Sequence, residues 1–291
     1  EQALDIFVGK SSDTGNLLST VEDLRNNDIK ISQTYSILNE EIEKSLEEFE
    51  KDPEFTLPGQ LREHVPGIDR QNLGVIFARP EVGKTSFAAW LSGWYVKNKH
   101  KVAYWGNEEP VRKTRMRVAK SITGKSKEEV LHNKDEFIKQ YKEEALPYIT
   151  FMDCVGTSIQ EIEDYCTRNE QDIIIIDQLD KIRIDGEFSR GDERLKELYC
   201  RSRELAKRHN VAVWAISQAS YDAHGRENID YSMLDGSKTG KAGEADIIIG
   251  IGVAEEEDFR TIKFSKNKIF FDLRKYISFQ IKSFGINKLE I

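Results

Sequence analysis

The stretch from Leu73 to Phe87, with the sequence LGVIFARPEVGKTSF, constrains this chain more than any other. Its first six residues are apolar and unbroken by charge, which is typical of a parallel strand covered on both faces. From Lys84 the apolar residues Phe87 and Leu91 recur at helical spacing. A strand, a turn and a helix in this order direct backbone N–H groups and the positive end of a helix dipole at one point. The stretch therefore predicts a phosphate-binding loop.

Three residues of the turn suit a nucleoside triphosphate. Gly83 lets the backbone approach an anion, Lys84 brings a flexible positive charge to the terminal phosphates, and Thr85 offers a hydroxyl to the accompanying magnesium ion. The motif departs from G-x-x-x-x-G-K-[ST] at its first position, Ala78, so a chance GKT tripeptide in a loop is the alternative. The residues predicted to bind the nucleotide are Ala78, Arg79, Pro80, Glu81, Val82, Gly83, Lys84, Thr85 and Ser86.

Composition excludes several classes of protein. The chain has 291 residues, with 43 basic and 51 acidic side chains and a net charge of −8. This balance argues against a surface that is basic throughout, although a local basic groove remains compatible with it. No apolar run approaches the ~20 residues that span a bilayer, and no signal-peptide pattern precedes residue 30. Three widely spaced cysteines fit a reducing compartment, so we expect a soluble intracellular protein.

The first 54 residues differ from the rest. Residues 1–30 are polar and aperiodic, whereas residues 35–49 carry apolar side chains at helical spacing beneath an acidic face. This amphipathic helix packs either on its own domain or on a neighbouring subunit, and the pattern alone leaves both open. The sequence starts at Glu1 without a methionine, so we expect a fragment of a longer chain. We expect an arm and linker helix at 1–54 and an ATPase domain at 55–291.

Two later strands supply polar side chains at their carboxyl ends. The run DIIIID at 172–177 predicts a central buried strand that ends in Asp177, the candidate for a second residue that organises magnesium. Residues 211–217 predict another buried strand, followed by Gln218, which is either a phosphate sensor or an ordinary strand-end residue.

The segments around these strands complete the predicted architecture. Residues 126–142 predict one strongly polar helix, whereas residues 219–243 show no core pattern and predict a long functional or mobile loop. Helices alternate with strands early and strands cluster late. This order predicts a mostly parallel α/β sheet with flanking helices and an antiparallel extension.

An ordered set of motifs resembles the ATPase domain of DnaB-type replicative helicases, which has a RecA-like P-loop fold. The segment ARPEVGKTS resembles the family's phosphate loop, in which alanine commonly stands first. WGNEEP resembles the segment with the catalytic glutamate, which selects Glu108 over Glu109. IIIIDQLDKI and AISQ resemble the acid-bearing strand and the strand ending in a phosphate-sensing glutamine. GSKTGKAGEAD resembles the DNA-binding loop, and TIKFSKNK the segment that reaches the neighbour's nucleotide. The resemblance covers about residues 55–291.

The resemblance implies a mechanism. ATP binds between subunits, Thr85 and Asp177 organise Mg2+, and Glu108 activates water while Gln218 senses the terminal phosphate. Where the family supplies an arginine finger, this sequence has Lys268, with Lys266 nearby, and a lysine lacks the planar fork of arginine. The resemblance also favours docking of the helix at 35–49 on a neighbouring subunit. The residues expected to hold single-stranded DNA are Ser237, Lys238, Thr239, Gly240 and Lys241.

The functional expectation is an ATP-dependent DNA helicase that translocates on single-stranded DNA as a homo-oligomeric ring, most simply a hexamer. The resemblance also implies a phage or bacterial protein in the cytoplasm, with a primase and a polymerase as replisome partners. Two alternatives share the fold. One is a RecA-like recombinase or signalling ATPase that does not unwind DNA, and the other is an assembly module that binds nucleotide without hydrolysis. Glu108 and Gln218 argue against the latter, and solvated surface lysines are the alternative to a DNA-binding loop.

Overall fold

The computed structural model describes residues 51–59, 61–106, 109–254, 259–269 and 278–282. The arm and the helix at 35–49 lie outside the described residues. A compact unit begins at Asp52. Before the main sheet, β1 (Phe55–Thr56) and β2 (Gly67–Ile68) form a small antiparallel pair, with α4 (Leu61–His64) between them.

A mixed sheet organises the described residues. Its strand order is β10-β9-β8-β3-β7-β6-β4-β5, in which β9 pairs antiparallel with both β8 and β10 and all the other neighbours pair in parallel. The prediction of a mostly parallel sheet with an antiparallel extension is confirmed. The strands are β3 (Leu73–Ala78), β4 (Val102–Gly106), β5 (Ile149–Asp153), β6 (Ile173–Ile176), β7 (Ala212–Gln218), β8 (Ile247–Val253), β9 (Phe259–Asn267) and β10 (Ser278–Lys282).

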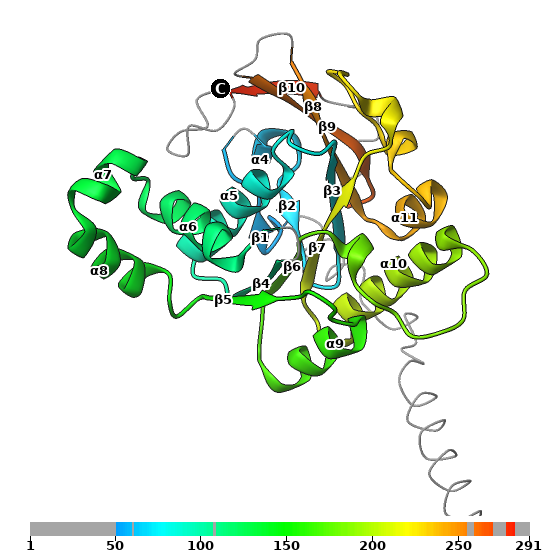
Figure 1. Ribbon diagram of the computed structural model, residues 1–291, viewed down its shortest axis with the longest axis horizontal. Helices are drawn as coiled ribbons and strands as arrows, with labels where there is room; N and C mark the ends of the chain where they lie inside the picture. Colours follow the sequence, from blue (N-terminus) through cyan, green and yellow to red (C-terminus); the bar gives the residue numbers. More distant parts are fainter. Residues whose placement is uncertain (1–50, 60, 107–108, 255–258, 270–277, 283–291) are drawn as a thin grey trace, which may run out of the picture. The chain divides into compact units, whose positions relative to one another are not determined.

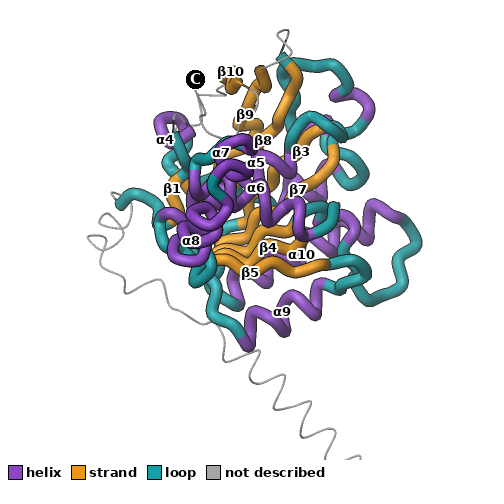
Figure 2. Tube along the Cα trace, turned by 60° about the vertical axis from the view of Figure 1, so that its left-hand side comes forward, coloured by secondary structure: helices purple, strands orange, loops and turns teal. Residues whose placement is uncertain are grey.

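Helices cover both faces of this sheet (Figures 1 and 2). The alternation of side chains along β3 divides the core into two clusters. Ile76 and Ala78 pack with the side of the sheet that holds α5 and α6, whereas Val75 and Phe77 pack with α9 and α10. The helices are α5 (Lys84–Lys97), α6 (Val111–Thr123), α7 (Lys127–His132), α8 (Lys134–Glu144), α9 (Ile159–Arg168), α10 (Gly191–Arg208) and α11 (Lys238–Glu244).

Two segments differ from the sequence prediction. The single helix predicted over 126–142 is instead two, because Asn133 ends α7 and begins α8, where its side-chain oxygen accepts a hydrogen bond from the N–H of Glu136. The segment 219–243 is also more ordered than its composition predicts. It contains the short 3-10 helices η3 (Tyr221–Ala223) and η4 (Tyr231–Met233) and the start of α11, and it buries Ile229 and Leu234.

Candidate nucleotide and DNA site

The predicted phosphate loop joins β3 to α5. Gly83 has φ 115° and ψ 16°, and Glu81 also has a positive φ of 66°, so the turn folds tightly before the helix. The first turn of α5 contains no acidic residue and has no side-chain cap, while Lys84 is 3% exposed. Backbone N–H groups at a helix start, together with a lysine, form an environment that suits phosphate. The loop therefore fits the nucleotide predicted from the sequence.

Two arginines outside the sequence prediction's catalytic set hold this loop. Arg79 donates through Nη1 to the carbonyl oxygen of Ala219 at 3.0 Å, which connects the loop to the residue after β7. Arg260 on β9 donates through Nε to the carbonyl oxygen of Val82, also at 3.0 Å. Arg79 is predicted as a nucleotide contact, and its geometry in this chain links the loop to a neighbouring strand end. Arg260 carries no motif signal, because its partner is 178 residues away.

The polar residues at the carboxyl ends of three adjacent strands share one edge of the sheet. Ala78 at the end of β3 is the register partner of Gln218 at the end of β7. The next strand is β6, which is followed directly by Asp177. Parallel strands place their carboxyl ends together, and ligands of open α/β sheets bind there. The phosphate loop, Gln218 and Asp177 are therefore brought to the same edge, as the sequence predicts.

Asp177 is 1% exposed and lies in a specific hydrogen-bonding environment. Its N–H donates to the carbonyl oxygen of Trp105 at 2.8 Å, and its Oδ2 accepts from the phenol of Tyr104 at 3.0 Å. Burial, and then the charge of Asp177, raise the pKa of Tyr104 well above its ordinary value. The phenol is therefore a proton donor throughout the neutral range. It fixes one carboxylate oxygen, as the outer partners of metal ligands commonly do.

The candidate general base, Glu108, lies outside the described residues, but its neighbour Glu109 is described. Glu109 Oε1 accepts hydrogen bonds from Arg117 Nη1 and from Thr114 Oγ1, both on α6. These bonds engage Glu109 with the helix that follows it. The selection of Glu108 over Glu109 remains a prediction.

Lys266 and Lys268, the two candidates for a trans-acting cation, both contact the carboxyl end of α11. Lys266 Nζ donates to the carbonyl oxygen of Ala242, and Lys268 Nζ donates to that of Gly243 at 3.1 Å. Burial lowers the pKa of Lys266 to about 8, and the neighbouring Lys268 contributes in the same direction. Cations at the carboxyl end of a helix are favourable. Within this chain both lysines stabilise α11.

The five residues predicted to bind DNA fall into two groups. Lys238 and Thr239 are exposed at the start of α11, and Ser237 is half-buried before it. Gly240 is buried, and a Cβ there would lie 2.5 Å from Ser237 Oγ. Lys241 is 0% exposed.

The expectation that Lys241 presents its charge to DNA is corrected by this burial. Its Nζ lies 2.8 Å from Asp180 Oδ2 and 3.0 Å from Ser217 Oγ, so its charge is taken up inside the protein. No local pattern signals this burial, because the partner acid is 61 residues away.

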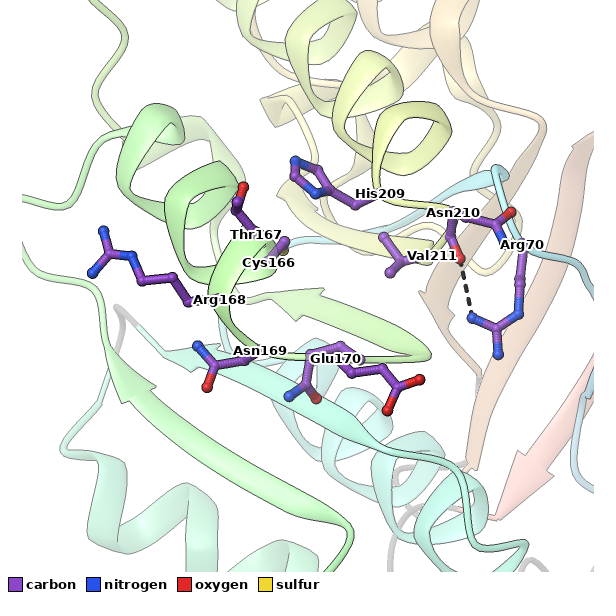
Figure 3. A pocket seen from close by; sticks show the side chains of 10 residues that line it. Arg70, Cys166, Thr167, Arg168, Asn169, Glu170, His209, Asn210 and Val211 are labelled. Carbon is purple, nitrogen blue, oxygen red and sulfur yellow. Dashed lines mark hydrogen bonds between the residues drawn. The ribbon is translucent and has the colours of Figure 1, made fainter.

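A separate hollow lies at the opposite edge of the sheet (Figure 3). It has a volume of about 370 Å³ and is lined by the carboxyl end of α9, the residues before β7, and Arg70. Arg70 donates to the carbonyl oxygen of Asn210 at 3.0 Å and forms ion pairs with Glu54 and Asp172. Arg70, Asp172 and Asn210 precede their strands, whereas the phosphate loop follows β3. The hollow is therefore distinct from the nucleotide edge.

In the part of the chain that the structure describes, no three His, Cys, Asp or Glu side chains gather into a metal site. Magnesium in nucleotide sites commonly takes one or two protein ligands and completes its shell with phosphate oxygens and water. The hydroxyl of Thr85 and the carboxylate of Asp177 are of the kinds that such an ion accepts. Among the described helices, none is long and apolar enough to cross a membrane.

Comparison with known proteins places this geometry in a family. Residues 56–257 match the model of the DnaB-like helicase C-terminal domain. One solved structure, the ATPase domain of a helicase, is similar with a TM-score of 0.69 at 18% identity, covering 84% of this chain and 95% of that one. A second, a DnaB-like replicative helicase described with its primase interactions, has a TM-score of 0.61 at 17% identity. That match covers 74% of this chain and 56% of the other. No curated protein sequence matches the chain.

Proposed function

This chain belongs to the DnaB-like helicase family, matching its C-terminal domain, and we propose how its residues divide the work of an ATP-driven replicative helicase. The domain hydrolyses ATP and has the RecA-like ATPase fold. The observation that carries the assignment of roles is the common edge of β3, β7 and β6, where the phosphate loop, Gln218 and Asp177 meet. A nucleotide at the loop would lie beside both other strand ends.

The residues of this edge have separate tasks in the proposed mechanism. Lys84 and the backbone N–H groups of the loop bind the phosphates of ATP, and Thr85 and Asp177 hold Mg2+. A bound magnesium ion supplies charge neutralisation on the terminal phosphates. Tyr104 keeps Asp177 oriented, and Gln218 detects the terminal phosphate. Glu108 accepts the proton of the attacking water.

The proposed site is completed by another subunit. Lys268 or Lys266 of a neighbouring chain would bring a positive charge to the transferred phosphate, so that hydrolysis depends on assembly into a ring, most simply a hexamer. Because a lysine is a point charge without a planar fork, we expect weaker stabilisation than an arginine finger provides. The helix at 35–49 is proposed to dock on that neighbour and hold the ring together.

Single-stranded DNA is proposed to run through the centre of the ring. The exposed start of α11, with Lys238, Thr239 and the backbone from Ser237, would hold its phosphates. Such contacts are electrostatic and independent of base sequence. A few cations from each subunit are enough to make a basic channel, so a net charge of −8 is compatible with DNA binding.

A replisome is the proposed setting. One similar solved structure is titled with its interactions with primase, which supports a primase as a partner of this chain. A replicative polymerase and action in the bacterial cytoplasm complete the proposal. The family resemblance supports both.

Unwinding of a forked DNA duplex with ATP tests the proposed function. The variants Glu108→Gln and Glu109→Gln make a matched pair, because each removes one carboxylate and Glu109 already binds Arg117 and Thr114. We expect unwinding by the wild type, loss of both hydrolysis and unwinding in Glu108→Gln, and retained activity in Glu109→Gln. ATP hydrolysis without unwinding in the wild type would instead favour the recombinase-like alternative. Loss of activity only in Glu109→Gln would reassign the base.

Filter binding of single-stranded DNA tests the role of α11. Lys238→Ala should weaken binding and lower the slope of affinity against salt by roughly one unit for each lost phosphate contact. Lys142→Ala, which removes the same charge from an exposed position on α8, is the control. Equal affinity and equal salt slopes in the two variants would contradict the proposed DNA contact.

A further inference from the structure

Lys241 forms a buried polar cluster with three other residues. Asp180 Oδ2 accepts hydrogen bonds from both Lys241 Nζ and Ser217 Oγ at 2.8 Å, and Lys241 Nζ lies 3.0 Å from Ser217 Oγ. Asp180 Oδ1 accepts from the phenol of Tyr199 at 3.0 Å, and Lys241 Nζ lies 5.4 Å from the centre of the Tyr199 ring. Each charge in the cluster therefore has a specific partner.

The members of this cluster come from four elements that meet at the nucleotide edge. Ser217 immediately precedes Gln218 on β7, and Asp180 lies on η2 (Leu179–Lys181), three residues after Asp177. Tyr199 lies on α10. Lys241 lies on α11, three residues after the exposed Lys238. The cluster thus connects the strand ends at the nucleotide edge with the helix that begins at the DNA segment.

The geometry makes this connection sensitive to small movements. Three polar atoms lie within 3.0 Å of one another, and a hydrogen bond is lost once its length passes about 3.5 Å. A shift of about 1 Å in the end of β7 would therefore break one contact or carry α11 with it. Because Lys241 is fully buried, separation from Asp180 would leave a charge without compensation, so the second outcome is the favourable one.

We infer that Lys241 is a positioning residue that couples the phosphate-reading strand ends to the DNA-binding segment through Asp180 and Ser217. The inference rests on the proposed DNA contact at Lys238. A change at Gln218 on binding or loss of the terminal phosphate moves Ser217, the Asp180–Lys241 pair transmits the movement, and α11 shifts its exposed start. The cluster is then the element whose arrangement both sites bias.

ATP hydrolysis with and without single-stranded DNA tests the inference. Lys241→Met removes the charge while keeping a long side chain, and we expect DNA stimulation of hydrolysis to fall about tenfold or more, with at most a threefold loss of hydrolysis without DNA. Leu198→Ala, which opens the apolar core of α10 next to Tyr199, is the control for general destabilisation. We expect it to lower the melting temperature and to keep DNA stimulation within about twofold of wild type.

The double variant Lys241→Met with Asp180→Asn separates coupling from stability, because it removes the lone buried charge that Lys241→Met leaves behind. We expect its melting temperature to return toward wild type while DNA stimulation stays lost. Recovery of DNA stimulation together with stability, or normal stimulation in Lys241→Met, would overturn the inference. Lys238→Ala in the DNA-binding assay distinguishes the premises. Unchanged affinity there overturns the proposed DNA contact and the inference with it, whereas weakened affinity with normal stimulation in Lys241→Met overturns the inference alone.

Discussion

The hydrogen bond from Tyr104 to Asp177 gives a quantitative test of the magnesium site. Tyr104→Phe deletes one hydroxyl from a residue that is 1% exposed, so it changes little besides the 3.0 Å bond to Asp177 Oδ2. A hydrogen bond to a charged group contributes about 1.5–3 kcal/mol, and the apolar edge left by phenylalanine offsets part of that loss. We therefore expect the free energy of unfolding to fall by about 1–2 kcal/mol.

The same deletion should affect magnesium more than it affects folding. With the phenol in place, one carboxylate oxygen of Asp177 is fixed and the carboxylate plane is set. Removal of an outer partner of a metal ligand typically costs roughly 10- to 100-fold in metal affinity or activity. We expect the magnesium concentration for half-maximal ATP hydrolysis to rise about tenfold, equivalent to about 1.4 kcal/mol.

Tyr95→Phe is the matched control for this measurement. The phenol of Tyr95 is equally buried, and it accepts a hydrogen bond from Trp214 Nε1 at 3.1 Å, in the half of α5 that lies away from the phosphate loop. Its loss should also destabilise the fold by about 1 kcal/mol or more, because it leaves a buried donor unpaired. Magnesium titrations at saturating ATP should separate the two variants. An equal magnesium requirement in both, or a lower one in Tyr104→Phe, would refute the assigned role of Tyr104.

Three other perturbations test the described contacts. Asp246→Asn should lower the free energy of unfolding by about 3 kcal/mol, because buried Asp246 Oδ2 accepts from the N–H of Leu73 and pairs with Arg203; an unchanged denaturant midpoint would contradict this. Between about pH 8 and 10 folded Lys266, which faces Lys268, Asp246 and Arg203, loses its proton while the unfolded chain keeps it, so stability should rise with pH and any hydrolysis that needs this charge should fall. Lys266→Met should abolish the stability rise in pH-dependent melting. Chelation of magnesium should abolish hydrolysis, and hydrolysis that persists with excess chelator would contradict the assigned metal.

The strand ends at the nucleotide edge were predictable because parallel sheets obey a simple rule. A continuous apolar run such as 172–177 indicates a central strand, and the residue that follows it must lie at the carboxyl edge with the phosphate loop. The pairing of Ala78 with Gln218 follows from the same rule. The positions of Lys84, Asp177 and Gln218 therefore required only the order of strands, turns and helices along the chain.

The polar cluster around Lys241 was not predictable in this way. A lysine in a glycine-rich stretch is usually a solvated cation, and its burial here depends on an acid and a hydroxyl from two distant elements. Tyr104 likewise looks like an ordinary apolar strand residue until the fold brings Asp177 beside it. The prediction of a long loop without core residues at 219–243 failed for a related reason. Its few apolar residues show no period, yet Ile229 and Leu234 are buried by the sheet and helices around them.

The structure also bears on which lysine acts between subunits. Lys266 is half-buried and donates to the carbonyl oxygens of Ala242 and Gly243, whereas Lys268 is exposed and donates to Gly243 alone. A lysine must leave these carbonyls to reach a neighbour's phosphate, and an exposed side chain with a single contact does so at lower cost. We therefore expect Lys268 to be the trans-acting cation.

Mixing of inactive variants tests this assignment. Lys84→Ala keeps the cation but lacks a working phosphate loop, whereas Lys268→Ala keeps the loop and lacks the cation. Each alone should be inactive, and an equimolar mixture should regain hydrolysis, because some interfaces then join an intact loop to an intact Lys268. Lys266→Ala should remain active alone, with a loss that reflects only the weaker hold on α11. Activity in Lys268→Ala alone, combined with complementation between Lys84→Ala and Lys266→Ala, would transfer the role to Lys266.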